Sequence, residues 1–325
     1  MTPDLPPLRL ARRLALILPL AAAGCNHRAA TPADGAGATA AAPTPAPTSA
    51  TVPQTLAWSD LAALPVAPAD ERVPYGDDPL QVAELRRPAS DGPFPVVVLV
   101  HGGCWRSAYD LRHVSQLAAA FAREGIATWT LEYRRLGDAG GGWPGTFEDV
   151  ARGVDRLRDV AAARGLDTTR VVLVGHSAGG QLALWAAARR APEGTVPRGP
   201  ALRARGVVGL AAITDLRSYG AAPGGCNAAV APLLGGTPAE VGARYDLVSP
   251  AALPPLDLPV RLVHGALDRT VPPEQSAWYA GYVNGAGGDA RVLLVPDAAH
   301  FDVVAPTTSA WPVVLGAVRD LLGAR

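Results

Sequence analysis

Residues 171–188 read VVLVGHSAGGQLALWAAA, and this stretch decides the fold that we expect for the whole chain. The four apolar residues before Gly175 favour a buried strand, and the alanine-rich run after Ser177 favours a helix. Gly175 and Gly179 flank Ser177, which suits a sharp turn from strand to helix. Such a turn is either a simple connection with an incidental serine or the support of an exposed nucleophile. The rest of the chain decides between the two.

Short apolar runs alternate with longer helical patterns from about residue 56 onward. We expect strands over residues 80–88, 95–103, 126–134, 170–175, 206–213, 259–265 and 290–296. We expect helices in the run after Ser177 and over residues 110–125, 146–165, 273–283 and 309–322. Continuous apolar strands that alternate with helices are typical of a parallel sheet between two helical layers. The sequence therefore predicts an α/β fold with a mostly parallel sheet, in which ligands bind beyond the carboxyl ends of the strands.

Side chains suited to nucleophilic catalysis follow three of these strands. GHSAG (175–179) fits the G-x-S-x-G pattern, in which a strained turn exposes the serine hydroxyl. A serine needs a general base, and among the six histidines His300 directly follows the last expected strand. Asp268 follows the preceding strand and lies between Ser177 and His300 in the chain, as the orienting carboxylate does in this pattern. Asp297 and Asp302 compete for that role, and we interpret both as solvated loop residues.

The stretch VHGGCW (100–105) ends another expected strand and is a candidate oxyanion hole. A carbonyl attacked by Ser177 acquires negative charge on its oxygen, which needs preorganised donors. The candidate donors are the backbone amides of Gly102, Gly103, Cys104 and Ala178. We expect His101 to brace this loop rather than to transfer protons.

Composition excludes several classes of function. The formal net charge of the 325-residue chain is zero, which argues against nucleic acid as a partner. All 29 basic residues are arginine, so a Schiff-base lysine, a phosphate-loop lysine and a Ser–Lys dyad are excluded. No histidine or cysteine spacing is typical of a metal site. We therefore expect a small-molecule substrate and neither a metal nor another cofactor, and the sequence leaves the oligomeric state open.

The first 55 residues are expected to lie outside the folded domain. Residues 1–25 combine a basic segment, a short apolar core and small residues, in the order of a secretory signal peptide. The ending AAGC also resembles a bacterial lipoprotein cleavage box, so lipidation of Cys25 and ordinary export both stay open. Residues 26–55 are rich in Ala, Pro and Thr and predict a disordered linker. We expect an exported, periplasmic protein, either free or anchored to the membrane through Cys25, with a catalytic domain over 56–325.

Five short motifs stand in this domain: HGGCW (101–105), EYR (132–134), GHSAGG (175–180), HGALDRTVP (264–272) and AAHF (298–301). Together they resemble the α/β-hydrolase superfamily, and in particular its carboxylesterase and arylformamidase-like branch, which includes hormone-sensitive-lipase-like enzymes. The resemblance covers nearly all of residues 56–325 and implies an eight-stranded hydrolase fold. It also implies Ser177 as nucleophile, Asp268 and His300 as its partners, and the oxyanion hole at the HGG turn. Cys104 stands where lipase-like members usually carry a third glycine, which makes the chain more similar to the formamidase-like HGG-x-W members.

Two cysteines and two tryptophans complete the expected site. Export favours an oxidising compartment, and Cys104 and Cys226 both fall near the expected active-site face, so we expect a disulfide between them. Trp105 and Trp143 are candidate pocket-lining residues, although core packing is the favoured interpretation for Trp105. Within EYR, Glu132 and Arg134 are interpreted as a structural pair at the strand end.

These observations predict a serine hydrolase that cleaves small carboxylic esters through an acyl-enzyme intermediate. Two alternatives stay open. One is an amide hydrolase of the arylformamidase kind, and the other is an inactive hydrolase fold that serves as a binding module. The segment between the strands at 206–213 and 259–265 is short for a lid, which favours short acyl groups or small aromatic esters over long-chain fats.

Overall fold

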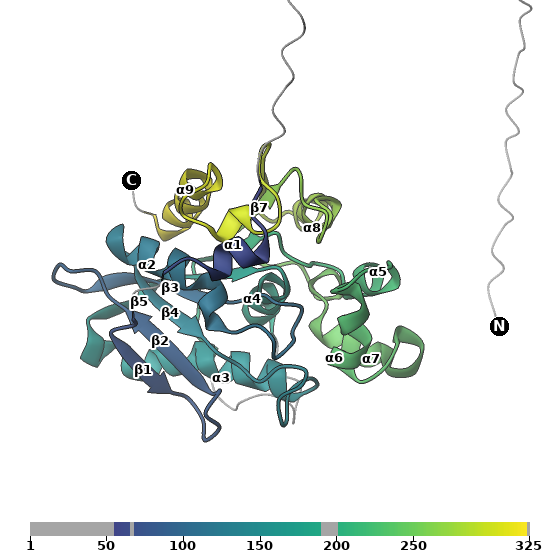
Figure 1. Ribbon diagram of the computed structural model, residues 1–325, viewed down its shortest axis with the longest axis horizontal. Coiled ribbons are helices and arrows are strands. Elements are labelled where there is room, and N and C mark those ends of the chain that lie inside the picture. The colour runs from purple at the N-terminus through teal and green to yellow at the C-terminus, as the bar shows by residue number, and fades with distance from the viewer. Residues whose placement is uncertain (1–54, 66–67, 190–200, 324–325) are drawn as a thin grey trace, which may run out of the picture. The chain divides into compact units, whose positions relative to one another are not determined.

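The computed structural model describes residues 55–65, 68–189 and 201–323 (Figure 1). All of them belong to one unit, Thr51–Arg325. The expected signal peptide, the lipidation candidate Cys25 and all but the last residue of the expected linker lie outside the described residues. Within the described ranges, no helix is both long enough and apolar enough to cross a membrane.

A single eight-stranded sheet runs through the domain. Its strands are β1 (Glu71–Pro74), β2 (Val82–Arg86), β3 (Phe94–Val100), β4 (Ala127–Leu131), β5 (Leu166–His176), β6 (Gly206–Leu210), β7 (Val260–Gly265) and β8 (Ala290–Val295). Their order across the sheet is β1-β2-β4-β3-β5-β6-β7-β8. The β1–β2 and β2–β4 pairs are antiparallel, and every other neighbouring pair is parallel. The expected α/β fold with a mostly parallel sheet is confirmed, and β1 is a strand that the sequence ranges did not include.

Helices cover both faces of the sheet (Figure 1). They are α1 (Trp58–Ala62), α2 (Ser115–Arg123), α3 (Gly145–Val160), α4 (Ala178–Ala188), α5 (Leu216–Ala221), α6 (Val230–Leu234), α7 (Pro238–Val248), α8 (Glu274–Gly285) and α9 (Ala310–Leu322). Short 3₁₀ turns lie at Leu111–Val114, Ala162–Arg164, Asn227–Ala229, Pro250–Ala252 and Asp302–Val304. The expected helix over 110–125 thus begins as a 3₁₀ turn, and the one over 146–165 ends early in another.

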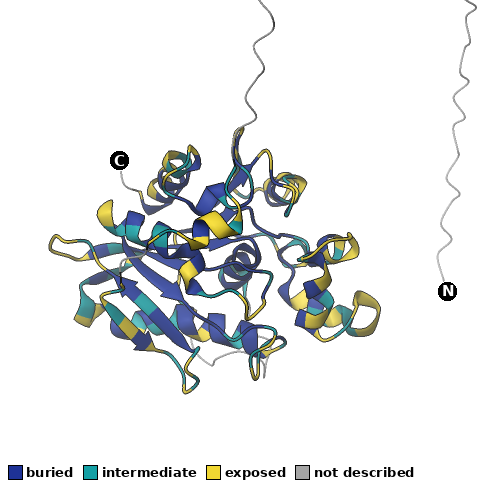
Figure 2. Cartoon of the chain, in the orientation of Figure 1, coloured by how far each residue is buried: buried dark blue, intermediate teal, exposed yellow. Residues whose placement is uncertain are grey.

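The surroundings of β3 explain why this strand is apolar along its whole length. Val96, Val98 and Val100 belong to one hydrophobic cluster, which also contains the buried faces of α3, α4 and α8. Val97 and Leu99 point to the other side and join a second cluster with α2 and α9. Because both faces of a central parallel strand are covered, every position of the strand except Pro95 is buried (Figure 2).

The segment between β6 and β7 folds into three short helices, α5, α6 and α7, which lie together at one side of the sheet (Figure 1). The sequence analysis did not predict these helices. Two of them have only 5 or 6 residues, too few to show a helical period clearly. This segment supplies one wall of the pocket described below.

Candidate active site

Ser177 lies at the turn between β5 and α4, directly beyond the carboxyl end of a central strand. Its backbone adopts φ 55° and ψ −118°, a left-handed conformation that is strained for a residue with a side chain. The amide of Ser177 donates to the carbonyl of Leu210 in β6 at 2.8 Å. The neighbouring strand therefore holds the strained residue in place, and the serine begins the helix instead of ending the strand.

The two flanking glycines are required by close backbone contacts. A Cβ atom at Gly175 would lie 2.1 Å from the carbonyl oxygen of Gly179. A Cβ atom at Gly179 would lie 2.2 Å from the carbonyl oxygen of Val100 at the end of β3. Any side chain at either position would force the turn open, so the G-x-S-x-G spacing is a steric requirement of this geometry.

His300 and Asp268 meet in the structure as the sequence predicted. Nδ1 of His300 donates to Oδ2 of Asp268 at 2.7 Å, and both side chains are buried. Oδ1 of the same carboxylate accepts the backbone amides of Thr270 and Val271 at 2.8 and 3.0 Å. Because the carboxylate fixes the proton on Nδ1, Nε2 of His300 is left as the acceptor that a general base needs.

Asp268 stays ionised although it is buried. Burial alone raises the pKa of its carboxyl group, but hydrogen bonds from His264 and His300 outweigh burial and hold the pKa well below its ordinary value. Nε2 of His264 lies 3.3 Å from Oδ2 of Asp268, and Nδ1 lies 2.7 Å from the hydroxyl of Ser276. His264 is a positioning residue that the sequence analysis did not identify. Its position four residues before Asp268, at the end of a strand, was the available signal.

Neither of the two competing carboxylates forms a hydrogen bond with a histidine of the described residues. Asp297 is exposed and accepts the hydroxyl of Ser309 at 2.8 Å. Asp302 is buried and accepts the backbone amides of Leu56 and Ala299 at 3.2 and 2.8 Å. The interpretation of Asp302 as a solvated loop residue was wrong, because its carboxylate satisfies amides of the turn that carries His300.

Ser177 and His300 line one pocket of about 670 Å³. Its walls also include three aromatic side chains, Trp58, Tyr109 and Phe301. Among the described residues, no hydrogen bond joins the hydroxyl of Ser177 to the ring of His300. Catalytic hydrogen bonds are often loose without substrate, so the shared pocket and the correctly oriented imidazole are the relevant observations.

The predicted oxyanion turn lies beside Ser177. A Cβ atom at Gly102 would lie 2.8 Å from the carbonyl oxygen of His176 and 3.2 Å from the Cβ of Ser177, so the turn packs directly on the serine. Gly103 and Cys104 have φ values of 107° and 53°, and both line the pocket. Within the described part of the chain, no acceptor takes the amides of these two residues or of Ala178. Ala178 is the first residue of α4, where an amide has no partner within the helix.

Cys104 and Cys226 form the expected disulfide, with Cα atoms 5.0 Å apart. Both cysteines line the pocket that contains Ser177. The bond joins the oxyanion turn to the loop that follows α5, two segments separated by 122 residues in sequence. The disulfide therefore links two walls of the pocket that are far apart in the sequence.

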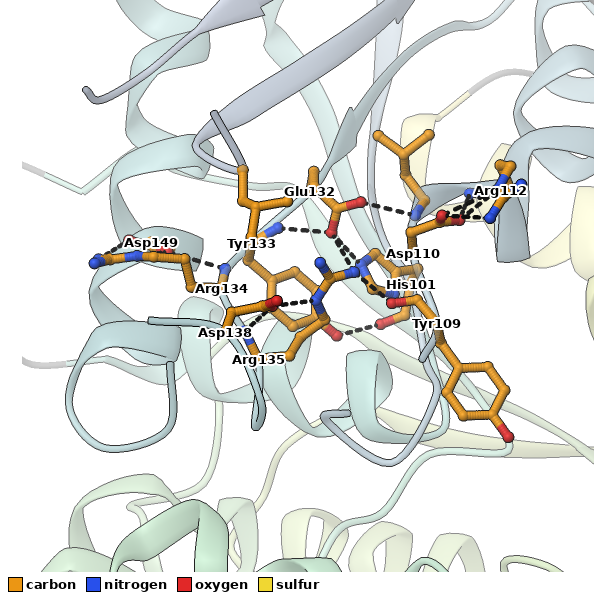
Figure 3. A network of polar contacts seen from close by, with 12 residues as sticks. His101, Tyr109, Asp110, Arg112, Glu132, Tyr133, Arg134, Arg135, Asp138 and Asp149 are labelled. Atoms are coloured by element: carbon orange, nitrogen blue, oxygen red, sulfur yellow. Dashed lines mark hydrogen bonds and ion pairs between the residues drawn. The ribbon is translucent and has the colours of Figure 1, made fainter. Parts of the chain in front are cut away.

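A buried polar network supports the oxyanion turn from below (Figure 3). Nε2 of His101 lies 3.0 Å from Glu132, and the carbonyl of His101 accepts the hydroxyl of Tyr133 at 2.8 Å. Glu132 also pairs with Arg135 at 2.9 Å. Burial raises the pKa of the Glu132 carboxyl group, but His101 and Arg135 together hold it below its ordinary value. The expectation that His101 braces this loop is confirmed.

The predicted pair of Glu132 and Arg134 was wrong. Arg134 instead binds the fully buried Asp149 of α3, to which its Nε and Nη2 atoms donate at 2.7 Å each (Figure 3). Strand alternation would place Glu132 and Arg134 on one face, but β4 ends at Leu131 and this alternation no longer holds in the irregular backbone that follows. Glu132 therefore pairs with Arg135, while Arg134 binds α3.

A chain of histidines lies behind the catalytic imidazole. Nε2 of His176 donates to the backbone carbonyl of His300 at 2.8 Å, and Nδ1 of His176 accepts from Nε2 of His113 at the same distance. Both rings are fully buried, which lowers their pKa values well below the ordinary range, and neighbouring histidines lower them further. Neutral His113 and His176 therefore position the backbone of His300. The sequence analysis gave neither residue a role.

The two tryptophans predicted to bind substrate do not line this pocket. Trp105 is completely buried, and its indole N–H donates to Oε1 of Gln181 in α4 at 3.1 Å. Trp143 packs on Phe147 of α3, with the guanidinium of Arg244 5.8 Å from the centre of its ring. Trp105 thus has the core position that the sequence analysis favoured, because the chain turns at Cys104 and directs the next side chain inward. The prediction that Trp143 lines the pocket was wrong.

Comparison with known proteins agrees with this geometry. The BD-FAE family model matches residues 85–281, more than half of the chain. A probable isoprenylcysteine alpha-carbonyl methylesterase of Oryza sativa subsp. japonica is 26% identical over 252 residues, covering 70% of this chain and 57% of the rice protein. The chain thus spans a little over half the length of this curated relative.

Solved structures show the same fold. A truncated carbohydrate esterase from gut microbiota superposes with a TM-score of 0.67 at 21% identity, covering 79% of this chain and 97% of that one. Esterase 2 of Thermogutta terrifontis, phosphonylated by sarin, superposes with a TM-score of 0.64 at 22% identity, covering 79% and 95%. The strained serine turn, the strand order and the match to the family model lead to one conclusion: the chain belongs to the BD-FAE family, within the esterase-type α/β-hydrolases.

Proposed function

We propose that this protein hydrolyses small carboxylic esters through an acyl-enzyme on Ser177. The observation that carries the proposal is the 2.7 Å hydrogen bond between His300 and Asp268, with His300 lining the same pocket as Ser177. The names of the relatives, which include a methylesterase and several esterases, support ester hydrolysis. Nothing in the pocket favours an amide over an ester, so the arylformamidase alternative is left to the assay.

The reaction proceeds in two halves. Nε2 of His300 takes the proton of the Ser177 hydroxyl as Oγ attacks the ester carbonyl carbon. The carbonyl oxygen becomes an oxyanion, which the amides of Ala178 and of the turn at Gly103 stabilise. The bond to the alcohol oxygen then breaks, and His300 gives its proton to the departing alcohol. Water, deprotonated by His300, attacks the acyl-enzyme, and the carboxylic acid leaves as Ser177 recovers its proton.

The pocket supports small substrates. Its volume of about 670 Å³ lies within the usual range for drug-sized ligands, which is about 300–1,000 Å³. One wall comes from the loop after α5 rather than from a long lid. Short acyl chains and small aromatic esters fit this space better than long-chain fats.

The test replaces the nucleophile. Ser177→Ala should leave a folded protein with 4-nitrophenyl acetate hydrolysis at the background rate, since the variant lacks the hydroxyl that the proposal assigns as nucleophile. The matched control is Ser59→Ala, an exposed serine on α1 that does not line the pocket. A fluorophosphonate probe should label the wild type and the control but not Ser177→Ala.

Two results would overturn the proposal. Full turnover by Ser177→Ala would show that another group is the nucleophile. A wild-type protein that neither reacts with the probe nor hydrolyses esters would support the inactive binding module. Parallel assays on N-formylkynurenine and on short esters separate the esterase from an arylformamidase.

The disulfide supports a further proposal, that the protein works in an oxidising compartment after export. Disulfides persist outside the reducing cytosol, and Cys104 and Cys226 are paired. Fractionation of cells that produce the full chain, followed by immunoblotting of periplasm and membranes, tests export and separates the free from the anchored form. Recovery of the protein only in the cytosolic fraction would contradict it.

A further inference from the structure

Two arginines line the pocket without a carboxylate partner. Arg106 and Arg269 are both exposed and belong to separate segments of the pocket lining: Arg106 directly follows the oxyanion turn, and Arg269 directly follows Asp268. The guanidinium of Arg106 makes one long contact of 3.5 Å to the carbonyl of Gly225. Within the described ranges, the side chain of Arg269 has neither a hydrogen bond nor an ion pair.

The neighbouring arginines outside the pocket behave differently. Arg112 pairs with Asp110 at 2.8 Å, and Arg135 pairs with Glu132 at 2.9 Å. Of the described residues that line the pocket, none is Asp or Glu. Asp268 lies behind His300, with its side chain fully covered. The pocket therefore carries two uncompensated positive charges, whereas the arginines around it are neutralised.

Another part of the pocket lining is apolar and consists of aromatic side chains. Trp58 and Tyr109 contact edge to face, with ring centres 4.9 Å apart, and Phe301 lies beside Trp58 with ring centres 6.1 Å apart. All three line the pocket together with Ser177. A ligand that matches both features has an apolar body, which the rings contact, and an anionic group, which the guanidinium groups bind.

Resting on the proposed function, we infer that the substrates are aromatic or alkyl esters that carry a carboxylate, which Arg106 and Arg269 bind. The anion lies on the part of the substrate that points toward the two guanidinium groups. The ester carbonyl meanwhile sits between Ser177 and the oxyanion turn. The two arginines determine specificity and take no part in bond breaking.

The experiment compares matched esters that differ only in charge. One pair, 4-acetoxybenzoate and its methyl ester, places the carboxylate on the alcohol part. The other pair, mono-4-nitrophenyl adipate and its methyl ester, places it on the acyl part. Each kcat/KM is divided by the rate of alkaline hydrolysis of the same ester, which corrects for intrinsic reactivity.

At low ionic strength, the charged member of at least one pair should have the higher corrected kcat/KM, mainly through a lower KM. An exposed ion pair contributes a factor of up to about five, so two guanidinium groups should give a preference of about tenfold. In the double variant Arg106→Gln/Arg269→Gln the preference should fall to about one. It should also fall in 0.5 M NaCl, because added salt screens exposed charges.

The matched control is Arg123→Gln. Arg123 is exposed on α2, does not line the pocket and has no ion-pair partner within the described part of the chain. This variant should keep the wild-type preference. A preference that is absent from both pairs, or that survives in the double variant, overturns the inference.

A binding measurement keeps this test separate from the proposed function. Ser177→Ala titrated with 4-acetoxybenzoate in a calorimeter should bind it, and adding Arg106→Gln/Arg269→Gln should weaken the binding about tenfold. If the wild type hydrolyses neutral esters through Ser177 without any charge preference, only the inference fails. If it hydrolyses neither member of a pair, the proposed function fails, and the calorimetric result alone decides whether the arginines bind the anion.

Discussion

Removing the disulfide between Cys104 and Cys226 should affect both the stability and the activity of this protein. The perturbation is the double variant Cys104→Ser/Cys226→Ser, which removes the bond without leaving a free thiol. Serine preserves the size of each side chain closely. The differences from the wild type then report the loss of the link between the two walls of the pocket.

The magnitude follows from the length of chain that the bond closes. The cysteines are 122 residues apart in sequence, and for a loop of that length the chain-entropy model gives a stabilisation of about 5 kcal/mol. Measured losses are typically about 2–5 kcal/mol. At about 2–4 °C of melting temperature per kcal/mol for a domain of this size, the variant should melt about 5–15 °C lower.

The activity should fall as well, because Cys104 lies in the oxyanion turn at positive φ. Complete loss of one oxyanion donor costs about 10²–10³ in kcat, and the network beneath the turn still holds His101. We therefore expect a smaller decrease of about tenfold in kcat, with KM less affected.

Thermal unfolding followed by circular dichroism and urea unfolding at 25 °C measure the first effect, and steady-state hydrolysis of 4-nitrophenyl acetate measures the second. The wild type treated with a reductant should behave as the double variant does. Unchanged melting temperature and unchanged kcat in the double variant would refute the reasoning, since neither the loop entropy nor the support of the turn would then depend on the bond.

Three further predictions concern buried groups. Asp268→Asn should lower kcat by about 10³–10⁴-fold with little change in KM, because the amide neither fixes the tautomer of the catalytic imidazole nor stabilises its charge; single-turnover kinetics check this. Asp149→Ala should reduce the free energy of unfolding by about 3–5 kcal/mol in urea titrations, because it leaves the Arg134 guanidinium without its buried partner, and an unchanged urea midpoint would contradict this. His113 and His176 have lowered pKa values in the folded state, so below about pH 6.5 the unfolded chain binds more protons and stability should fall with falling pH, by roughly 1 kcal/mol per pH unit for each histidine. Replacing His113 by Gln should flatten this dependence in urea unfolding between pH 5 and 7, and an equally steep dependence in that variant would count against its neutral state in the fold.

Local sequence patterns determined the architecture and the centre of the site. Continuous apolar runs such as β3 and β5 need cover on both faces, and that requirement alone predicts a parallel sheet between helices. The carboxyl ends of parallel strands meet at one edge, so the chain order was enough to bring Ser177 and His300 to one pocket, with Asp268 bound to the imidazole behind it. The disulfide was also predicted, because both of its cysteines follow strands at this edge of the sheet.

Outside the pair of Asp268 and His300, the tertiary structure alone decided the partners of the polar side chains discussed above. Whether Glu132 binds Arg134 or Arg135 depends on which face of the chain points toward the oxyanion turn. The motif alone could not decide whether Trp105 lines the pocket or packs in the core, because the direction of a side chain after a left-handed turn depends on the fold. The free charge of Arg106 and Arg269 is likewise a property of what surrounds them. The sequence determines the hydrophobic periodicity and the order of the strands and helices along the chain. The burial of a side chain and the choice of its polar partner depend on residues that only folding brings together.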